Sequence, residues 1–286
     1  MATTADPPGR PLPGGAADPD AGPDAASAPD DAAWRVAVVT GASSGIGREM
    51  ARQLASGGTA LVLVARDEVR LHTLADELPV DVEVLAADLA DPAALATVEA
   101  RVADPDRPVD LVVNNAGFGT YGDFATLDRA GETCEIGVNV TAVVRLTHAA
   151  LGGMLGRGRG AVLNVGSVAG LQATPGNATY GATKAFVASF GEAVAGELTG
   201  TGVTLTTVLP GFTRTEFAER AGIGGRRIPE RAWMSADDVA RQSLDAARAG
   251  RPWLVPGMAN KLLVAASTPV PRGLKRRIAA RLAGRM

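Results

Sequence analysis

Cysteine and histidine are scarce in this chain, which has one cysteine and two histidines among 286 residues. A lone cysteine, Cys134, forms no disulfide within the chain. This is typical of proteins in a reducing compartment, and we expect the cytoplasm. The two histidines, His72 and His148, lack the spacing of metal ligands, so we predict no metal site.

A basic surplus and a long apolar run are also missing. The net charge of −3 argues against a nucleic-acid-binding protein. A membrane-spanning helix needs about 20 mostly apolar residues. The best candidate, 253–270, is interrupted by Pro256, Lys261 and Pro269. Aromatic residues are only 4% of the chain, but hydrophobic residues are 46%, which is enough for a large aliphatic core.

The two ends of the chain differ in composition from its middle. Residues 1–33 are rich in Pro, Gly, Ala and Asp and have no apolar block of the roughly 7–15 residues found in a secretory signal. We predict that 1–33 is a disordered tail and that 34–257 is a single domain.

Residues 258–286 form a basic extension, which we predict to be helical. Leu274, Ile278 and Leu282 are spaced as on one side of a helix. Two hypotheses follow: the helix makes peripheral contact with an anionic membrane surface, or it docks on the rest of the protein or on a partner subunit. The basic residues of the proposed helix are Lys275, Arg276, Arg277, Arg281 and Arg285.

Short apolar runs alternate with longer amphipathic segments between residues 34 and 257. The apolar runs lack polar alternation, as in strands buried on both faces of a parallel sheet. Strand–helix alternation of this kind predicts a doubly wound α/β sheet. The predicted strands are 36–40, 60–65, 82–87, 109–114, 161–166, 203–209 and 253–255, and the predicted helices are 46–56, 67–77, 91–102, 132–152, 179–199 and 236–249.

A glycine-rich turn, 40–47, joins the first predicted strand to the first helix. Glycine allows a tight turn and a close backbone approach to a pyrophosphate, and the helix N-terminus favours its negative charge. Serine hydroxyls add further donors. The turn therefore predicts a dinucleotide site, formed by Gly41, Ser43, Ser44, Gly45, Ile46 and Gly47.

The end of the second predicted strand indicates the cofactor. A carboxylate there grips the adenosine ribose of NAD, but this strand ends in Arg66, which suits a 2′-phosphate. We therefore favour NADP(H) over NAD(H), with Asp67 as the residue that would serve NAD. Asp88 and Leu89 are predicted to receive the adenine. Small residues after the fourth strand, at Asn115, Ala116 and Gly117, let the backbone pass beside the ribose.

A catalytic set is predicted from three residues that follow the fifth predicted strand, namely Ser167, Tyr180 and Lys184. A phenol has a pKa of about 10 and is a poor base. Lys184 follows Tyr180 by one helical turn, and its charge is expected to lower the pKa of that tyrosine. Tyr180 then exchanges a proton with a carbonyl oxygen, and Ser167 donates a hydrogen bond to the same oxygen.

Together these motifs resemble the short-chain dehydrogenase/reductase family of the compact single-domain type, over about residues 34–257. The resemblance implies a Rossmann fold with about seven strands. It also implies that NADP(H)-dependent hydride transfer interconverts a ketone or aldehyde and an alcohol. It further implies a fourth catalytic residue, Asn139, which holds a water beside the lysine, and a nicotinamide site at Pro210, Gly211 and either Thr213 or Thr215.

Family analogy also indicates partners. Members commonly pair through the two long helices, here 132–152 and 179–199, so a homodimer or homotetramer is expected. The substrate site falls between Ser167, 118–124, 169–179 and 214–233, and the last of these segments resembles a mobile lid. An apolar carbonyl or alcohol substrate is predicted from Phe118, Tyr121, Leu171, Phe212 and Phe217, whereas Arg214, Arg226 and Arg227 are the residues that would receive an acidic one.

Two other functions compete with the oxidoreductase. A non-enzymatic dinucleotide sensor or scaffold would use the same fold but has no need of Ser167, Tyr180 and Lys184. A sugar-nucleotide epimerase or dehydratase usually has a Gly-x-x-Gly-x-x-Gly turn and a larger C-terminal substrate domain. The intact catalytic set and the Gly-x-x-x-Gly-x-Gly turn favour the oxidoreductase.

Overall fold

The computed structural model describes residues 34–173, 175–217 and 230–267. The predicted tail 1–33 lies outside the described residues. So do Arg226 and Arg227 and the basic segment 268–286, which includes Leu274, Ile278 and Leu282.

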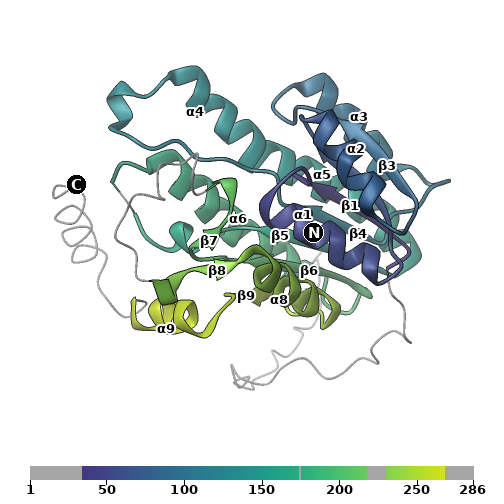
Figure 1. Ribbon diagram of the computed structural model, residues 1–286. Coiled ribbons are helices and arrows are strands. Elements are labelled where there is room, and N and C mark those ends of the chain that lie inside the picture. Colours follow the sequence, from purple (N-terminus) through teal and green to yellow (C-terminus); the bar gives the residue numbers. More distant parts are fainter. Residues whose placement is uncertain (1–33, 174, 218–229, 268–286) are drawn as a thin grey trace, which may run out of the picture. The chain divides into compact units, whose positions relative to one another are not determined.

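Seven parallel strands form a central sheet in the order β3-β2-β1-β4-β5-β6-β9 (Figure 1). The order reverses between β1 and β4, and ligands bind beyond the strand ends at such a switch point. The predicted doubly wound sheet is confirmed, with each strand within two residues of its expected bounds. The strands are β1 Val36–Thr40, β2 Ala60–Ala65, β3 Val82–Ala86, β4 Leu111–Asn114, β5 Gly160–Val165, β6 Val203–Val208 and β9 Trp253–Leu254.

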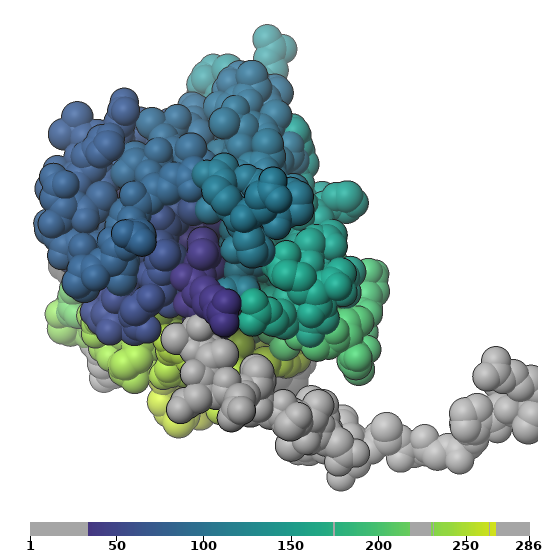
Figure 2. All heavy atoms as spheres, turned by 90° about the vertical axis from the view of Figure 1, so that its right-hand side faces the viewer, coloured from purple at the N-terminus to yellow at the C-terminus, as the bar shows by residue number. Residues whose placement is uncertain are grey.

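Helices cover both faces of the sheet because the strands are apolar on both sides. Val39 packs into one buried cluster with α1, α2 and α8, whereas Val38, its neighbour on β1, packs into another with α3, α5 and α6. Viewed from the side of α2, β3 and α3, the earlier part of the described chain, in purple and blue, packs directly against the later part, in green and yellow (Figure 2). These helices are α1 Gly45–Ser56, α2 Glu68–Glu77, α3 Pro92–Ala103, α5 Val143–Arg157, α6 Ala178–Glu197 and α8 Ala236–Arg248.

Two aspartates predicted as the first residues of helices are caps instead. The Asp67 carboxylate accepts a hydrogen bond from the Arg70 backbone N–H at 3.0 Å, and Asp91 does the same for Ala94 at 2.8 Å. A capping side chain satisfies an N–H that has no partner inside the helix. Both helices therefore begin one residue later than predicted.

The predicted helix 132–152 is longer and less regular than expected. It consists of α4 Arg129–Ile136, a π-helical turn Gly137–Ala142 and α5 Val143–Arg157. Single π-turns in helices often occur at functional sites, and this turn carries the fully buried Asn139. By length and composition the combined helix is apolar enough to cross a membrane. Leu146 and Met154 are fully buried in the cluster on the sheet, as in a core helix.

Several short elements had no signal in the sequence. β7 Thr213–Arg214 pairs in parallel with β8 Met234–Ser235, at the two ends of the predicted lid segment. α9 Met258–Ser267, in contrast, lies within the extension that was predicted to be helical, and its buried Asn260 packs directly against Gly211. Three 3₁₀ turns complete the described elements: Phe124–Thr126, Val168–Leu171 and Glu230–Ala232.

Candidate active site

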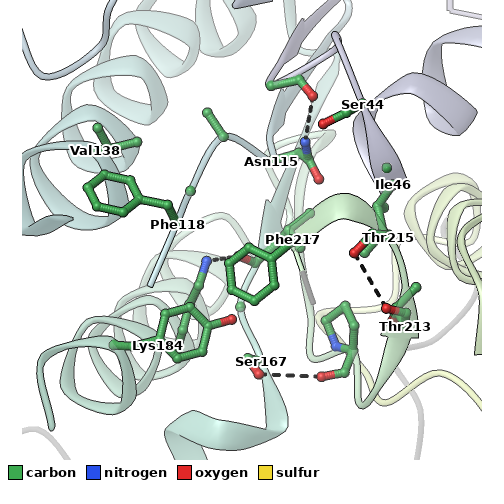
Figure 3. Close-up of a pocket in the computed structure, with 18 of the residues that line it drawn as sticks. Ser44, Ile46, Asn115, Phe118, Val138, Ser167, Lys184, Thr213, Thr215 and Phe217 are labelled. Carbon is green, nitrogen blue, oxygen red and sulfur yellow. Dashed lines mark hydrogen bonds between the residues drawn. The ribbon is translucent and has the colours of Figure 1, made fainter. Parts of the chain in front are cut away.

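A cavity of about 820 Å³ opens at the carboxyl ends of the strands, where the sheet order reverses. Figure 3 shows Ser167 and Lys184 on one side of it and Ser44 and Ile46 on the other, with Phe217 between them. Gly47 and Asn139 are the predicted site residues that do not line it. Those that do are Gly41, Ser43, Ser44, Gly45, Ile46, Arg66, Asp88, Leu89, Asn115, Ala116, Gly117, Ser167, Tyr180, Lys184, Pro210, Gly211, Thr213 and Thr215.

The turn after β1 is shaped by glycines. Gly41 and Gly45 have φ angles of 67° and 55°, in the left-handed region that favours glycine. A Cβ atom on Gly47 would lie 2.4 Å from Asn115 Nδ2 and 2.5 Å from the Gly41 carbonyl oxygen. Gly47 therefore lies beneath the turn and lets it close, which explains why it does not line the cavity. The Ser44 side chain makes no capping bond to α1, although Ser44 is the N-cap residue.

Asn115 holds this turn against the end of β4. Its side-chain Nδ2 donates to the carbonyl oxygens of Thr40 at 2.9 Å and Gly41 at 3.3 Å. The buried Thr40 hydroxyl in turn accepts from the backbone N–H groups of Asn115 and Ala116, both at 3.0 Å. Asn115 thus has a structural role and also faces the cavity.

At the far end of the cavity, the neighbouring charged side chains of Arg66 and Asp67 differ in their contacts. The Asp67 carboxylate caps α2 and lies 3.3 Å from the Arg70 guanidinium, which also pairs with Glu216 at 2.8 Å. Arg66 is exposed, and no ion pair between described residues includes it. The guanidinium of Arg66 is therefore available for an anion, whereas the carboxylate beside it is already bound.

Asp88 and Leu89 form the adjoining wall after β3. Asp88 Oδ1 accepts from the Ala90 backbone N–H at 2.9 Å, and Leu89 is buried. On the opposite side, the Thr213 hydroxyl donates to the Gly211 carbonyl at 3.1 Å, and the Thr215 methyl group faces Gly45. Both threonines line the cavity, so the choice between them stays open.

Lys184 is buried in α6, with 5% of its surface exposed. Its Nζ donates to the Val165 carbonyl at the end of β5 at 2.9 Å and lies 5.7 Å from the centre of the Tyr180 ring. Burial lowers the pKa of Lys184 to about 8, and the Glu135 carboxylate opposes this shift. Gly117 allows the approach, since a Cβ atom there would be 3.3 Å from Nζ.

Tyr180 lies on the same face of α6, and Gly119 makes room for its ring. Burial raises the pKa of Tyr180 to about 12, although a hydrogen bond with Ser167 lowers it. The expectation of a lowered tyrosine pKa is therefore wrong for this protein without a ligand. Loss of water around the phenolate outweighs the hydrogen bond with Ser167, and the charge of Glu135 adds to the rise. The Ser167 hydroxyl also accepts from the Ala169 N–H at 3.1 Å.

Asn139 lies behind the catalytic residues and faces away from the cavity. Its Nδ2 donates to the Phe118 carbonyl at 2.8 Å and to the Thr183 hydroxyl at 3.1 Å, while its Oδ1 accepts from the Phe118 N–H at 3.1 Å. A Cβ atom on Gly117 would lie between Asn139 Oδ1 and Lys184 Nζ. The side chain thus fixes the backbone that passes over the lysine.

The expected apolar lining is present with one exception. Leu171 does not line the cavity and packs instead beside Leu209 and Val255. The Phe217 ring contacts the Tyr180 ring at 5.5 Å between centroids. The sequence did not single out Trp233, Gln172 or Asn177 as lining residues. The aromatic residues that line the cavity as predicted are Phe118, Tyr121, Phe212 and Phe217.

Two buried acids next to the site were also missed. Glu132 and Glu135 in α4 are 8% and 0% exposed, and both contact the Thr120 hydroxyl. Glutamates three residues apart in a helix are usually solvated, so their spacing carried no signal.

Comparison with known proteins gives the same picture. The family model for short chain dehydrogenases matches residues 35–223. Sulfoacetaldehyde reductase 2 of Chromohalobacter salexigens is 41% identical over 64% of this chain and 74% of that protein. A short-chain dehydrogenase of Sphingobium yanoikuyae in complex with NADPH is 38% identical, with a TM-score of 0.72 over 84% of this chain and 94% of the other. A bulky-bulky ketone specific alcohol dehydrogenase of Comamonas testosteroni is 32% identical, with a TM-score of 0.69 over 82% and 92%.

Proposed function

Because this chain belongs to the short-chain dehydrogenase family, we propose that it interconverts a ketone or aldehyde and the corresponding alcohol with NADP(H). One observation carries the proposal. Ser167, Tyr180 and Lys184 come from two different elements and line the same cavity as the glycine turn 41–47. A dinucleotide sensor has no need of that arrangement.

The residues along the cavity fit a nicotinamide dinucleotide. The glycine turn and the N-terminus of α1 suit the pyrophosphate, and the uncommitted Ser44 hydroxyl adds a donor. Asp88 and Leu89 suit the adenine, and Lys184 suits the nicotinamide ribose. Pro210, Gly211, Thr213 and Thr215 suit the nicotinamide, which supplies or accepts the hydride when it is bound.

The catalytic residues transfer the proton and form hydrogen bonds to the carbonyl oxygen of the substrate. Tyr180 donates its phenol proton to the carbonyl oxygen in reduction and takes it back in oxidation. Ser167 is hydrogen-bonded to the phenol and would donate to the same substrate oxygen. A lysine pKa near 8 makes Lys184 able to exchange a proton near neutral pH. Asn139 is proposed to hold the backbone beside Lys184, and the water predicted there stays a prediction.

The preference for NADP(H) is supported by the contrast between Arg66 and Asp67. Arg66 is exposed at the cavity without an ion pair to a described residue, and a 2′-phosphate is a suitable partner. Asp67, which would serve NAD, is bound to the α2 N-terminus and to Arg70.

An apolar substrate is proposed from the aromatic residues at the cavity and from the bulky ketones named for the Comamonas enzyme. A spectrophotometric assay tests the function. NADPH absorbance is followed with purified protein over a panel of bulky ketones, small ketones, aldehydes and sulfoacetaldehyde. We expect consumption of NADPH with at least one apolar carbonyl. No consumption with any of them, and none of NADP⁺ with the alcohols, would reject the proposal.

We also propose that the protein works in the cytoplasm as a homodimer or homotetramer. The single cysteine supports the compartment. Exposed apolar side chains on the two long helices, Ile136, Leu155 and Phe186, support the pairing. Analytical ultracentrifugation tests it, and a monomer at micromolar concentration would contradict it.

A further inference from the structure

Glu132 and Glu135 share one hydroxyl group. The Thr120 Oγ1 contacts Glu132 Oε1 and lies 3.0 Å from Glu135 Oε2. A threonine hydroxyl has one hydrogen and therefore donates to only one of these oxygens. Its contact with the other is a hydrogen bond only if that carboxyl group carries a proton and donates to the hydroxyl oxygen.

The surrounding donors indicate which carboxyl group is protonated. Glu132 also receives the hydroxyl of Thr179, so two hydroxyl groups point at its two oxygens, as suits an ionised carboxylate. Apart from the shared Thr120 hydroxyl, Glu135 receives only the backbone N–H of Thr120, at 2.9 Å on Oε2. Its Oε1 is buried and has no hydrogen-bond partner among the described residues.

An ionised Glu135 would leave charge on an oxygen without a partner in a fully buried site. Burial raises the pKa of Glu135, and so does the neighbouring Glu132. Hydrogen bonds from Thr120 and the charge of Lys184 act in the other direction but do not reverse the shift.

We propose that Glu135 is a positioning residue of the catalytic centre, held at neutral pH as an uncharged carboxylic acid that donates to Thr120, which in turn donates to ionised Glu132. The kinetic part of this inference rests on the proposed oxidoreductase function, and the structural part does not. A neutral Glu135 forms no ion pair with Lys184, so the charge of that lysine stays available to Tyr180 and the cofactor.

The acid also links the site to pH. The groups that Glu135 influences are Tyr180 and Lys184 on α6, and its own neighbour on α4 is Glu132. As the pH rises and Glu135 ionises, its negative charge raises the pKa of both Tyr180 and Lys184. The catalytic pair therefore keeps its protons to a higher pH than it would without this acid.

Urea unfolding as a function of pH tests the protonation. A raised pKa in the folded state means that the stability linked to Glu135 is complete below the unfolded value, about 4.3, and is lost as the pH rises through the folded value. Over that window the folding constant of wild type should fall about tenfold per pH unit relative to Glu135→Gln, which has no proton to lose. Equal pH dependence in the two proteins would overturn the proposal.

Glu132→Gln is the matched variant, because it removes the ionised partner and frees the Thr120 hydroxyl to donate to Glu135. We expect its loss of stability with rising pH to end at a lower pH than in wild type, because the folded pKa of Glu135 falls while the unfolded value is unchanged. The infrared spectrum of wild type at neutral pH should contain the carbonyl stretch of a protonated, buried carboxyl group. This measurement needs no variant to fold, and the absence of the band would overturn the proposal.

The kinetic test is the pH profile of NADPH-dependent reduction, with a carbonyl compound identified in the panel. The high-pH fall in rate should move to lower pH in Glu135→Gln, by on the order of one pH unit for a charge acting across a few ångströms of protein. An unchanged profile would contradict the positioning role. If wild type reduces nothing, the proposed function fails, while unfolding and infrared spectra still decide the state of Glu135.

Discussion

The turn after β1 and the opposite wall of the cavity differ in the chemical groups that form them. The turn uses backbone groups and three glycines within seven residues, 41–47. The opposite wall includes the buried Lys184 from α6, and two more deeply buried polar side chains lie next to this wall, Glu135 from α4 and Asn139 from the π-helical turn.

The two regions therefore affect the stability of the folded protein in different ways. The turn carries little backbone strain, because glycine adopts its positive φ angles without a steric penalty. The opposite wall carries a desolvated lysine whose pKa is lowered to about 8 and a tyrosine whose pKa is raised to about 12. At neutral pH the lysine lowers stability, because burial disfavours its ammonium, whereas the neutral tyrosine does not. Groups with perturbed pKa values cluster at active sites.

The strongest test of the catalytic wall is Tyr180→Phe. Loss of the proton donor should lower kcat at least ~100-fold, the low end for general acid–base catalysis, with NADPH affinity largely kept. Tyr121→Phe removes the other tyrosine hydroxyl of the chain and should cost far less. Steady-state kinetics of both variants check this, and similar losses would remove Tyr180 from its role.

Lys184→Met should abolish activity yet stabilise the fold. The ammonium is disfavoured in the folded state, so stability is lost as the pH falls from 10.5 through about 8. At pH 7 the variant should gain up to about 3 kcal/mol, and the gain should disappear above pH 10.5. Urea unfolding at both pH values measures it, with the exposed Lys261→Met as control. A destabilised variant at pH 7 would mean that the bond to Val165 matters more than burial.

Arg66→Ala tests the adenosine end of the cavity. Removing the charged contact to a 2′-phosphate should weaken NADPH binding by about 1.5–3 kcal/mol and leave NADH binding nearly unchanged. Arg70→Ala should have a smaller effect, because that guanidinium already pairs with Glu216 and Asp67. Fluorescence titration with both cofactors is decisive. A wild type that binds NADH as tightly as NADPH would refute the proposed preference.

Gly47→Ala probes the turn itself. The new methyl group would meet Asn115 Nδ2 at 2.4 Å, so we expect a loss of about 1–3 kcal/mol in unfolding free energy. Gly152→Ala in α5, where a Cβ atom meets nothing within 4 Å, should instead gain roughly 0.5–1 kcal/mol. Equal effects of the two changes on thermal unfolding would show that the turn is not tightly packed.

The strands, the glycine turn and the set of Ser167, Tyr180 and Lys184 could be predicted from the sequence alone. Each depends on residues close together in the chain: apolar runs, a turn between a strand and a helix, and side chains one helical turn apart. The strand ends were therefore predicted within two residues. Arg66 is another local signal, since it directly follows β2.

The hydrogen bonds and pKa values of the buried groups in the site depend on tertiary packing and could not be predicted from the sequence. The Asn139 side chain in the π-helical turn donates hydrogen bonds to the Phe118 carbonyl and to the Thr183 hydroxyl, which are far from it in the chain. The Thr120 hydroxyl between Glu132 and Glu135, and the burial that raises the pKa of Tyr180, arise only when distant elements pack together. A protonation state depends on lost water and nearby charges in three dimensions, and neither quantity is written in the local order of residues.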